Sequence, residues 1–400
     1  MRFAYKEYFS KALENIRQEK RYRTFTPLEK SPRSFPRAIS HKAQQQEVTL
    51  WGTNDYLGLS MSKEAIAAAQ EQAAKGGVGS GGTRNISGTH PLHVSLEKTL
   101  AKLHNKDRAL LFNSGYTANE WTLFTLGRLM PGCTILSDAH NHASMIAGIC
   151  ASGASKLIFQ HNSVDHLHAL LKNLPVNVPK VIACESVYSM EGDFAPLEDF
   201  CALARQHNAL LYLDEVHAVG LYGQTGGGLS EVKGLQDDVH LIQGTLAKAF
   251  GTIGGYVAGD ETLIDVVRSQ ASGFIFSTAL PAMVLAAALS NVERVMTCPE
   301  ITRDFWLAVD QTKKALSQRN IPFSATESHI LPLIVGDGER LEKMANTLLT
   351  EHHIYLQAVN YPTVPRGTER FRITPLRAHN THMIDHFAAA LSKVWHQNTF

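Results

Sequence analysis

The sequence has little net charge, few cysteines and no long hydrophobic run, and each shortage excludes a class of protein. A formal net charge of +1 argues against nucleic acid or an anionic membrane as the main partner. The five cysteines are scattered without a CxxC pair, which fits a reducing cytoplasm better than a disulfide framework. No window reaches about eighteen uninterrupted apolar residues, and the N-terminus lacks the apolar core of a signal peptide. We therefore expect a cytoplasmic protein that binds neither membrane nor nucleic acid.

Familiar phosphate-loop and metal motifs are also missing. The sequence contains neither a Walker A lysine motif nor an HExxH motif. Histidines gather within 140–142 and 161–168, but no carboxylate or cysteine completes a tetrahedral ligand set at regular spacing. We therefore expect no metal site, and we interpret His161, His166 and His168 as surface residues of a loop and a helix start.

Glycine is concentrated in one segment, GGVGSGGTRNISG at residues 76–88. Gly77, Gly79 and Gly82 satisfy the pattern G-x-G-x-x-G, but an alanine-rich helix precedes them where a dinucleotide-binding fold requires a strand. Polar residues follow where the packing helix should begin. We interpret the segment as a flexible loop that carries polar substrate contacts.

The rest of the chain predicts an α/β protein. With 400 residues and 44% hydrophobic content, it can bury a sizeable core and form more than one domain. Short apolar runs alternate with helical patterns, which predicts a mostly parallel sheet with helices on both faces. We expect an N-terminal helix and strand segment (1–50), a large domain (51–296) and a smaller α+β domain (297–400). The strands expected in the large domain are Ala109–Asn113, Thr134–Ser137, Lys156–Gln160, Lys180–Glu185, Ala209–Asp214, Val239–Gln243 and Gly254–Ala258, and the helices between them include Asn119–Leu129, Ala143–Ser152 and Leu197–Gln206.

Polar residues end most of these apolar runs. Ligands bind beyond the carboxyl ends of the strands in a parallel sheet. We therefore expect the polar residues at these ends to converge on one crevice; they are Asn113, Ser114, Asp138, Glu185, Asp214 and Lys248.

Three residues near successive strand ends indicate the chemistry of that crevice. Lys248 lies among small residues in QGTLAKAFG, where burial would lower its pKa and make the amine a nucleophile able to form a Schiff base. Asp214 closes the apolar run LLYLD, where a carboxylate is costly unless a cation pairs with it. A protonated pyridine nitrogen would supply that cation, and His217 could then bond the phenolic oxygen of the ring. The pattern predicts a site for pyridoxal phosphate.

Weaker signals support the same cofactor. In FNSGYTAN (residues 112–119) a strand end turns into a helix, so free backbone N–H groups at the helix N-terminus could hold a phosphate with help from the Thr245 hydroxyl. An ordinary β-to-α turn explains this motif equally well. His142 has a flat ring suited to stacking on an aromatic cofactor, although a capping histidine is the simpler alternative.

Arginines near the C-terminus suggest a carboxylate grip. Strand alternation over Arg370–Thr374 places Arg370 and Arg372 on one face, and an inward arginine can hold a carboxylate in a bidentate fork. Surface salt bridging is the ordinary alternative for Arg366 and Arg370. We expect the Pro- and Gly-bounded loop before this strand to form a lid.

Several segments together resemble the α-oxoamine synthases in order and spacing. That family has the aspartate aminotransferase fold (type I), uses pyridoxal phosphate and condenses an amino acid with an acyl-CoA while losing carbon dioxide. The stretch VNYPTVPRGTERFR resembles the members that join glycine to succinyl-CoA. The resemblance covers nearly the whole chain, and the other segments that carry it are WGTNDYLGLS, GSGGTRNISGT, NHASM, ESVYSMEGD, DEVHAVGLYG, GTLAKAFG and GFIFSTALP.

The resemblance also implies a role for each matching residue. Lys248 and His142 would be the catalytic residues, as the Schiff-base lysine and the ring-stacking group. The enzyme would be a homodimer with its active site at the subunit interface. The implied cofactor contacts are Lys248, His142, Asp214, His217, Gly115, Tyr116, Ser189 and Thr245, with Ser277 and Thr278 from the neighbouring subunit; Arg372, Asn54 and Ser189 would hold glycine, and Arg21, Thr83, Asn85 and Ile86 the succinyl end.

Two alternatives stay open. One is a sister enzyme that joins glycine to acetyl-CoA or another acyl-CoA, because the family pattern Pro-Ser-Pro-x-His is replaced here by Pro375-Leu376-Arg377-Ala378-His379. The other is a catalytically silent regulatory relative, against which the intact Lys248 and Asp214 argue. The sequence does not separate a tetrapyrrole pathway from a secondary-metabolite pathway.

Overall fold

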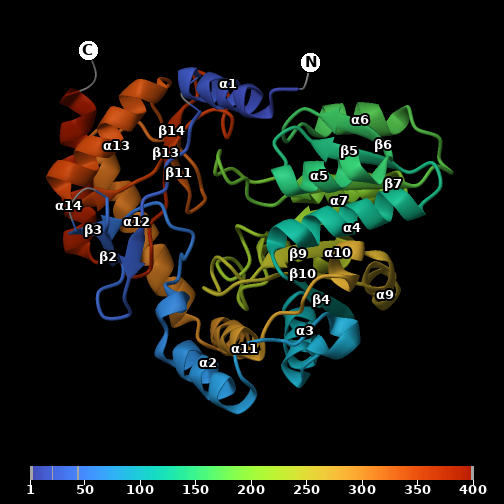
Figure 1. The fold of residues 1–400 in the computed structure, drawn as a ribbon. Coiled ribbons are helices and arrows are strands. Elements are labelled where there is room, and N and C mark those ends of the chain that lie inside the picture. Colours follow the sequence, from blue (N-terminus) through green and yellow to red (C-terminus); the bar gives the residue numbers. More distant parts are fainter. Residues whose placement is uncertain (1–2, 20, 43–44, 398–400) are drawn as a thin grey trace. The chain divides into compact units, whose positions relative to one another are not determined.

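The computed structural model describes residues 3–19, 21–42 and 45–397, which form two compact units (Figure 1). The large unit contains Asn54–Leu307 and Leu376–Ala378. The small unit is discontinuous and draws on Met1–Thr53, Ala308–Pro375 and His379–Phe400. The division expected at residues 50 and 296 stays a prediction.

A seven-stranded sheet organises the large unit, in the order β4-β10-β9-β8-β7-β5-β6. Strand β10 runs antiparallel to both of its neighbours, whereas the pairs from β9 to β6 are all parallel. The α/β class with a mostly parallel sheet is therefore confirmed. The strands are β4 (Arg108–Phe112), β5 (Thr134–Asp138), β6 (Ser155–Phe159), β7 (Lys180–Glu185), β8 (Leu210–Asp214), β9 (Leu241–Thr245) and β10 (Gly255–Gly259).

Helices flank this sheet (Figure 1). Alternate strand residues such as Val181, Ala183 and Tyr212 share a buried cluster with apolar residues of α4, α5 and α9. The helices of the large unit are α2 (Lys63–Gly76), α3 (Pro91–Leu103), α4 (Gly115–Leu129), α5 (Ala143–Ser152), α6 (Val164–Lys172), α7 (Leu197–Gln206), α8 (Leu229–Val232), α9 (Glu261–Gln270), α10 (Ser272–Ile275) and α11 (Ala282–Thr297), with short turns η1 (Leu59–Met61), η2 (Arg84–Gly88) and η3 (Gln236–Asp238).

The small unit has its own sheets and core. One sheet has the order β1-β2-β3-β12, with β12 parallel to β3, and the other has the order β11-β14-β13. The elements are α1 (Tyr5–Gln18), β1 (Leu28–Lys30), β2 (Arg37–Ser40), β3 (Gln46–Leu50), α12 (Glu300–Ser317), β11 (Leu331–Ile334), α13 (Gly338–His352), β12 (Ile354–Tyr355), β13 (Ala358–Val359), β14 (Arg370–Ile373) and α14 (Thr381–Gln397).

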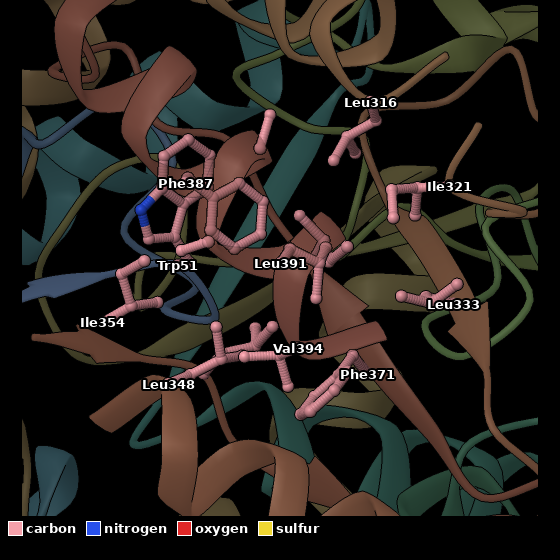
Figure 2. Close-up of a cluster of buried hydrophobic side chains, with 14 of the residues drawn as sticks. Trp51, Leu316, Ile321, Leu333, Leu348, Ile354, Phe371, Phe387, Leu391 and Val394 are labelled. Carbon is pink, nitrogen blue, oxygen red and sulfur yellow. The ribbon is translucent and has the colours of Figure 1, made fainter. Parts of the chain in front are cut away.

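Trp51 lies in the core of the small unit (Figure 2). Its ring stacks on Phe387 and on His379, with centroid distances of 3.9 and 3.8 Å. Phe371 and Ile373 of β14 join the same core, so the alternation predicted for this strand is confirmed. In the described part of the chain, no helix has both the length and the apolar character needed to span a membrane.

Candidate active site

Asp214 lies at the carboxyl end of β8, in register with Glu185 on one side and Gln243 on the other. The side chain is buried, and its oxygens accept hydrogen bonds from Asn119 Nδ2 at 2.6 Å and from the Val216 N–H at 2.8 Å. Burial raises the pKa of Asp214, while these two neutral donors act in the opposite direction. Among the described residues none forms an ion pair with this carboxylate. It is therefore placed to receive a cation from a bound molecule.

A chain of hydrogen bonds connects Asp214 to His142. Asn119 Nδ2 also donates to Ser144 Oγ at 3.0 Å, and Asn119 Oδ1 accepts from the Tyr212 hydroxyl at 2.7 Å. Ser144 Oγ lies 2.7 Å from Nδ1 of His142, which also accepts from the Ser144 N–H. His142 thus does cap α5, as the simpler interpretation held. The same network also fixes the orientation of its ring.

The imidazole of His142 forms one end of this network. Burial lowers its pKa, and the charge of Lys248 acts in the same direction against that of Asp214. The ring is therefore neutral at pH 7. Tyr116 meets it edge-on, with ring centroids 6.3 Å apart.

His217 follows β8 by one turn and is buried. Its Nδ1 lies 2.8 Å from the hydroxyl of Tyr56, which donates to Oδ1 of Asn54 at 3.1 Å. Tyr56 therefore brings Asn54 close to His217, although the motifs that contain them are far apart in the sequence.

Lys248 lies in the turn that joins β9 to β10 and is half-buried, so it is less enclosed than the sequence suggested. The turn is closed by hydrogen bonds from Gly251 N–H to the Lys248 carbonyl and from Leu246 N–H to the Gly254 carbonyl. The charge of Lys248 acts to lower the pKa of both Asp214 and Glu185. The amine is thus within electrostatic range of the buried carboxyl groups.

The start of α4 is where the sequence predicted an anion site. Ser114 Oγ accepts from the Thr117 N–H at 3.1 Å, whereas no hydrogen bond from the N–H groups of Gly115 or Tyr116 is found within the described ranges. A Cβ on Gly115 would lie 3.4 Å from Oγ1 of Thr245, so these two residues are close together. The Thr245 hydroxyl donates to the Gly254 carbonyl at 3.0 Å. Two backbone donors and the positive end of a helix are therefore available to a phosphate.

The glycine-rich segment is tied to the segment that contains Ser277. Thr83 and Thr278 form an isolated antiparallel bridge, and the Asn113 amide donates to the Thr278 carbonyl at 2.9 Å. Asn85 and Ile86 are exposed at the tip. The segment thus exposes the side chains of Asn85 and Ile86 to solvent, while the bridge at Thr83 holds its backbone.

Arg84, which directly precedes those exposed residues, is itself only partly exposed. Its guanidinium forms a bidentate pair with Glu97, at 2.8 and 3.2 Å, and lies over the ring of Phe274. Both charged side chains are about 15% exposed or less. The pair holds the turn η2 in place, which the sequence did not indicate.

The expected substrate arginines belong to the small unit. Arg372 is buried on β14. Arg21 follows α1, pairs with Glu19 at 2.6 Å and lies over the ring of Tyr361 in the expected lid. Arg370 is buried as well and donates to the Thr368 carbonyl, so a surface salt bridge is the wrong interpretation for it.

Some residues of the site carried no local signal. Asn119 and Tyr56 act through partners 95 and 161 positions away, which no local pattern reveals. His161 is not a free surface residue, as the sequence suggested, because only 17% of its side chain is exposed. Its ring bridges Asp138 at 2.8 Å and Asp193 at 2.9 Å. It thereby ties the end of β5 to the loop that contains Ser189.

These residues fit a phosphorylated pyridine cofactor, because they offer a buried carboxylate without an ion pair, a flat neutral ring, an amine and a helix N-terminus. Residues 46–391 match the family described as aminotransferase class I and II. The 5-aminolevulinate synthase of Bradyrhizobium diazoefficiens is 46% identical over 98% of this chain and 96% of its own length. 5-Aminolevulinate synthase 2 of Cereibacter sphaeroides is 47% identical over 98% and 96%. The chain belongs to the 5-aminolevulinate synthase family.

Solved structures also show that the chain has the type I fold of pyridoxal-phosphate enzymes. A serine palmitoyltransferase from S. paucimobilis with bound PLP superposes with a TM-score of 0.90 at 28% identity, covering 99% of both chains. The serine palmitoyltransferase of Sphingomonas wittichii gives 0.89 at 26% identity, covering 98% of this chain and 97% of its own. Pyridoxal phosphate is the cofactor of this 5-aminolevulinate synthase family member.

Proposed function

We propose that this protein condenses glycine with succinyl-CoA to give 5-aminolevulinate, coenzyme A and carbon dioxide. The observation that carries the proposal is the gathering of Lys248, Asp214, His142 and His217 at one sheet edge, in a chain that aligns over 98% of its length with 5-aminolevulinate synthases. A cytoplasmic enzyme of a tetrapyrrole or a secondary-metabolite pathway fits this reaction.

Each residue at the carboxyl ends of these strands has a separate role in the proposed reaction. Bound pyridoxal phosphate supplies an electron sink for the electrons left on the glycine α-carbon. Asp214 keeps the ring nitrogen protonated, His217 bonds the phenolic oxygen and His142 covers one face of the ring. Lys248 would hold the cofactor through its aldehyde carbon, and its Nζ, when free, would take the α-proton of glycine.

In this proposal, residues of two subunits contact the cofactor. The phosphate of the cofactor is held by Gly115, Tyr116 and Thr245. Ser189 makes a further contact with the cofactor. Ser277 and Thr278 add contacts from the neighbouring subunit of a homodimer.

Substrate selection rests on carboxylates. Arg372, Asn54 and Ser189 hold the carboxylate of glycine. Arg21 receives the carboxylate of the succinyl chain, with Thr83, Asn85 and Ile86 lining that end of the site. Because Arg21 is paired with Glu19, the succinyl carboxylate must join or displace that pair.

A panel of acyl-CoA donors tests the proposal. Purified enzyme with glycine should use succinyl-CoA at least tenfold better than acetyl-CoA, because a hydrogen bond to a charged group contributes about 1.5 kcal/mol or more and a tenfold change requires about 1.4 kcal/mol. Arg21→Leu should lose this preference while retaining the yellow colour of the bound cofactor. Lys248→Ala should abolish turnover without unfolding the chain. Equal rates with acetyl-CoA would show that the acyl assignment is wrong.

A further inference from the structure

Glu185 is a second carboxyl group at the same sheet edge, and none of the roles proposed above uses it. It ends β7, is only 3% exposed, and stands in register with Asp214 on the neighbouring parallel strand. Its Oε1 accepts the backbone N–H of His142 at 2.6 Å. Within the described residues, its Oε2 forms no hydrogen bond.

The two neighbouring carboxyl groups cannot both be charged at low cost. Adjacent strands are about 4.8 Å apart, and two buried carboxylates at that spacing repel each other. Burial and the charge of Asp214 raise the pKa of Glu185 well above its usual value; the His142 N–H and the charge of Lys248 oppose this, and Asp138 adds to it.

The hydrogen bonds decide which group keeps the proton. Asp214 accepts two hydrogen bonds and faces the expected ring nitrogen, so the negative charge is better stabilised there. Glu185 accepts only one side-chain hydrogen bond. Since Oε1 is occupied as an acceptor, the proton of Glu185 resides on Oε2.

We propose that Glu185 is a further binding residue of this active site, whose Oε2 hydroxyl donates a hydrogen bond to an anionic oxygen bound beyond the carboxyl ends of β7 and β8. This inference rests on the proposed function. It adds to that function a protonated Glu185, which stabilises the negative charge on the bound oxygen. The oxygen belongs either to the cofactor, as its phenolic oxygen, or to glycine, as its carboxylate.

Infrared difference spectroscopy of the full-length protein distinguishes these two sources. The carbonyl stretch of a protonated carboxyl group should be present in the wild type and missing in Glu185→Gln. If the acceptor is the cofactor oxygen, this band moves to lower frequency when pyridoxal phosphate is added to the apoenzyme. If the acceptor is glycine, the band moves only when glycine is added to the holoenzyme.

Glu215 provides a matched control. It is also fully buried, but its oxygens accept from Ser186 Oγ and from the N–H groups of Leu229 and Ser230. Glu215→Gln should leave the ligand-dependent shift intact. A missing Glu185 band, or a band that neither ligand moves, would overturn the proposal even in an enzyme that is active with succinyl-CoA.

Two variants separate a donor role from a purely structural one. Glu185→Gln keeps a donor and the acceptor for His142, so it should lower kcat less, and displace the pH midpoint of the visible cofactor band less, than a variant without a donor. Glu185→Leu removes the donor, and kcat should fall by about 100-fold with a displaced pH midpoint. A Leu variant that binds the cofactor with an unchanged midpoint and an unchanged kcat contradicts the proposal.

Discussion

Asn119 favours the charged form of Asp214, the proposed partner of the cofactor's ring nitrogen. Its amide donates to Asp214 and to Ser144, and it accepts from Tyr212, so three partners fix its orientation. A buried carboxylate that loses such a donor becomes easier to protonate. The affinity of the ring nitrogen for the site is therefore controlled by a residue that belongs to no recognised motif.

Asn119→Ala should weaken cofactor binding about tenfold, since one hydrogen bond to a buried charged group is worth about 1.5 kcal/mol. The loss should be larger at pH 6 than at pH 8, because the variant raises the pKa of Asp214. Absorbance titration of the apoenzyme with pyridoxal phosphate measures both effects. Asn105→Ala, which removes an exposed hydrogen bond to Asp237, should bind the cofactor like the wild type.

His161 should make the fold less stable as the pH rises into the alkaline range. Burial alone would lower its pKa, but the hydrogen bonds and charges of Asp138 and Asp193 raise it from 6.5 to about 10. A group whose pKa is higher in the folded state stabilises the fold fully below its unfolded pKa. That stabilisation is then lost as pH rises from about 6.5 to about 10.

The wild type should therefore lose more stability than His161→Gln between pH 7 and pH 10. We expect a difference on the order of 2 kcal/mol, below the full value of the pKa change because solvent reaches part of the pair. Urea unfolding at the two pH values measures it. A parallel loss in both proteins would show that the bridge contributes nothing.

At the scale of elements, β10 is the strand that passes closest to the proposed phosphate site at the start of α4. It is the antiparallel member of the sheet, and a Cβ on its Gly255 would approach the Gly115 nitrogen to 2.4 Å. This glycine therefore allows the strand to pass against the start of α4. The close approach explains why the first turn of α4 is held beside Thr245.

Gly255→Ala should displace the start of α4 and weaken cofactor binding by at least tenfold, with a loss of about 2 kcal/mol in stability from overpacking. Cofactor titration and thermal unfolding test the two effects separately. Gly76→Ala is the matched control, because a Cβ there meets no atom within 4 Å. If both variants bind the cofactor equally, the contact between β10 and α4 does not shape the site.

Helices and strands with a clear local pattern were predictable from the sequence, whereas the residues that they contact in the tertiary fold were not. The bounds of α5, α7 and β7 agree with the prediction, because apolar periodicity and flanking turn residues mark them. The bounds of the helix in the expected N-terminal segment come from the structure: α1 ends at Gln18, and the Arg21 N–H donates to the Ile16 carbonyl beyond its last turn.

Residues at strand ends could likewise be found from the sequence, since Asp214 and Glu185 stand out at the end of apolar runs. Their different environments could not, because Asn119 and the N–H of His142 reach them only through the tertiary fold. The register of neighbouring strands places the two carboxyl groups side by side, and their different hydrogen bonds make Asp214 the better anion.

At the scale of the molecule, a shared active site predicts complementation between subunits. Lys248→Ala and Ser277→Tyr should each be inactive as homodimers. In a mixed dimer, one site would combine both changes while the other would combine an intact Lys248 with an intact Ser277. Co-expression with two affinity tags should therefore restore about half of the wild-type activity per dimer.

The size of the assembly provides the control for that experiment. Sedimentation should give a dimer for the wild type and for both variants. A mixed dimer without activity, or an active monomer, would contradict the assignment of Ser277 and Thr278 to the neighbouring site.

The small unit is discontinuous, and this has a consequence for synthesis on the ribosome. Strand β3 ends at Leu50 and pairs with β12, which starts at Ile354. At about 5–20 residues per second, β3 leaves the ribosome roughly 15–60 s before its partner exists. The large unit can fold during that interval. The first fifty residues must wait with an unpaired strand edge, so chaperone demand should be concentrated on the nascent N-terminus.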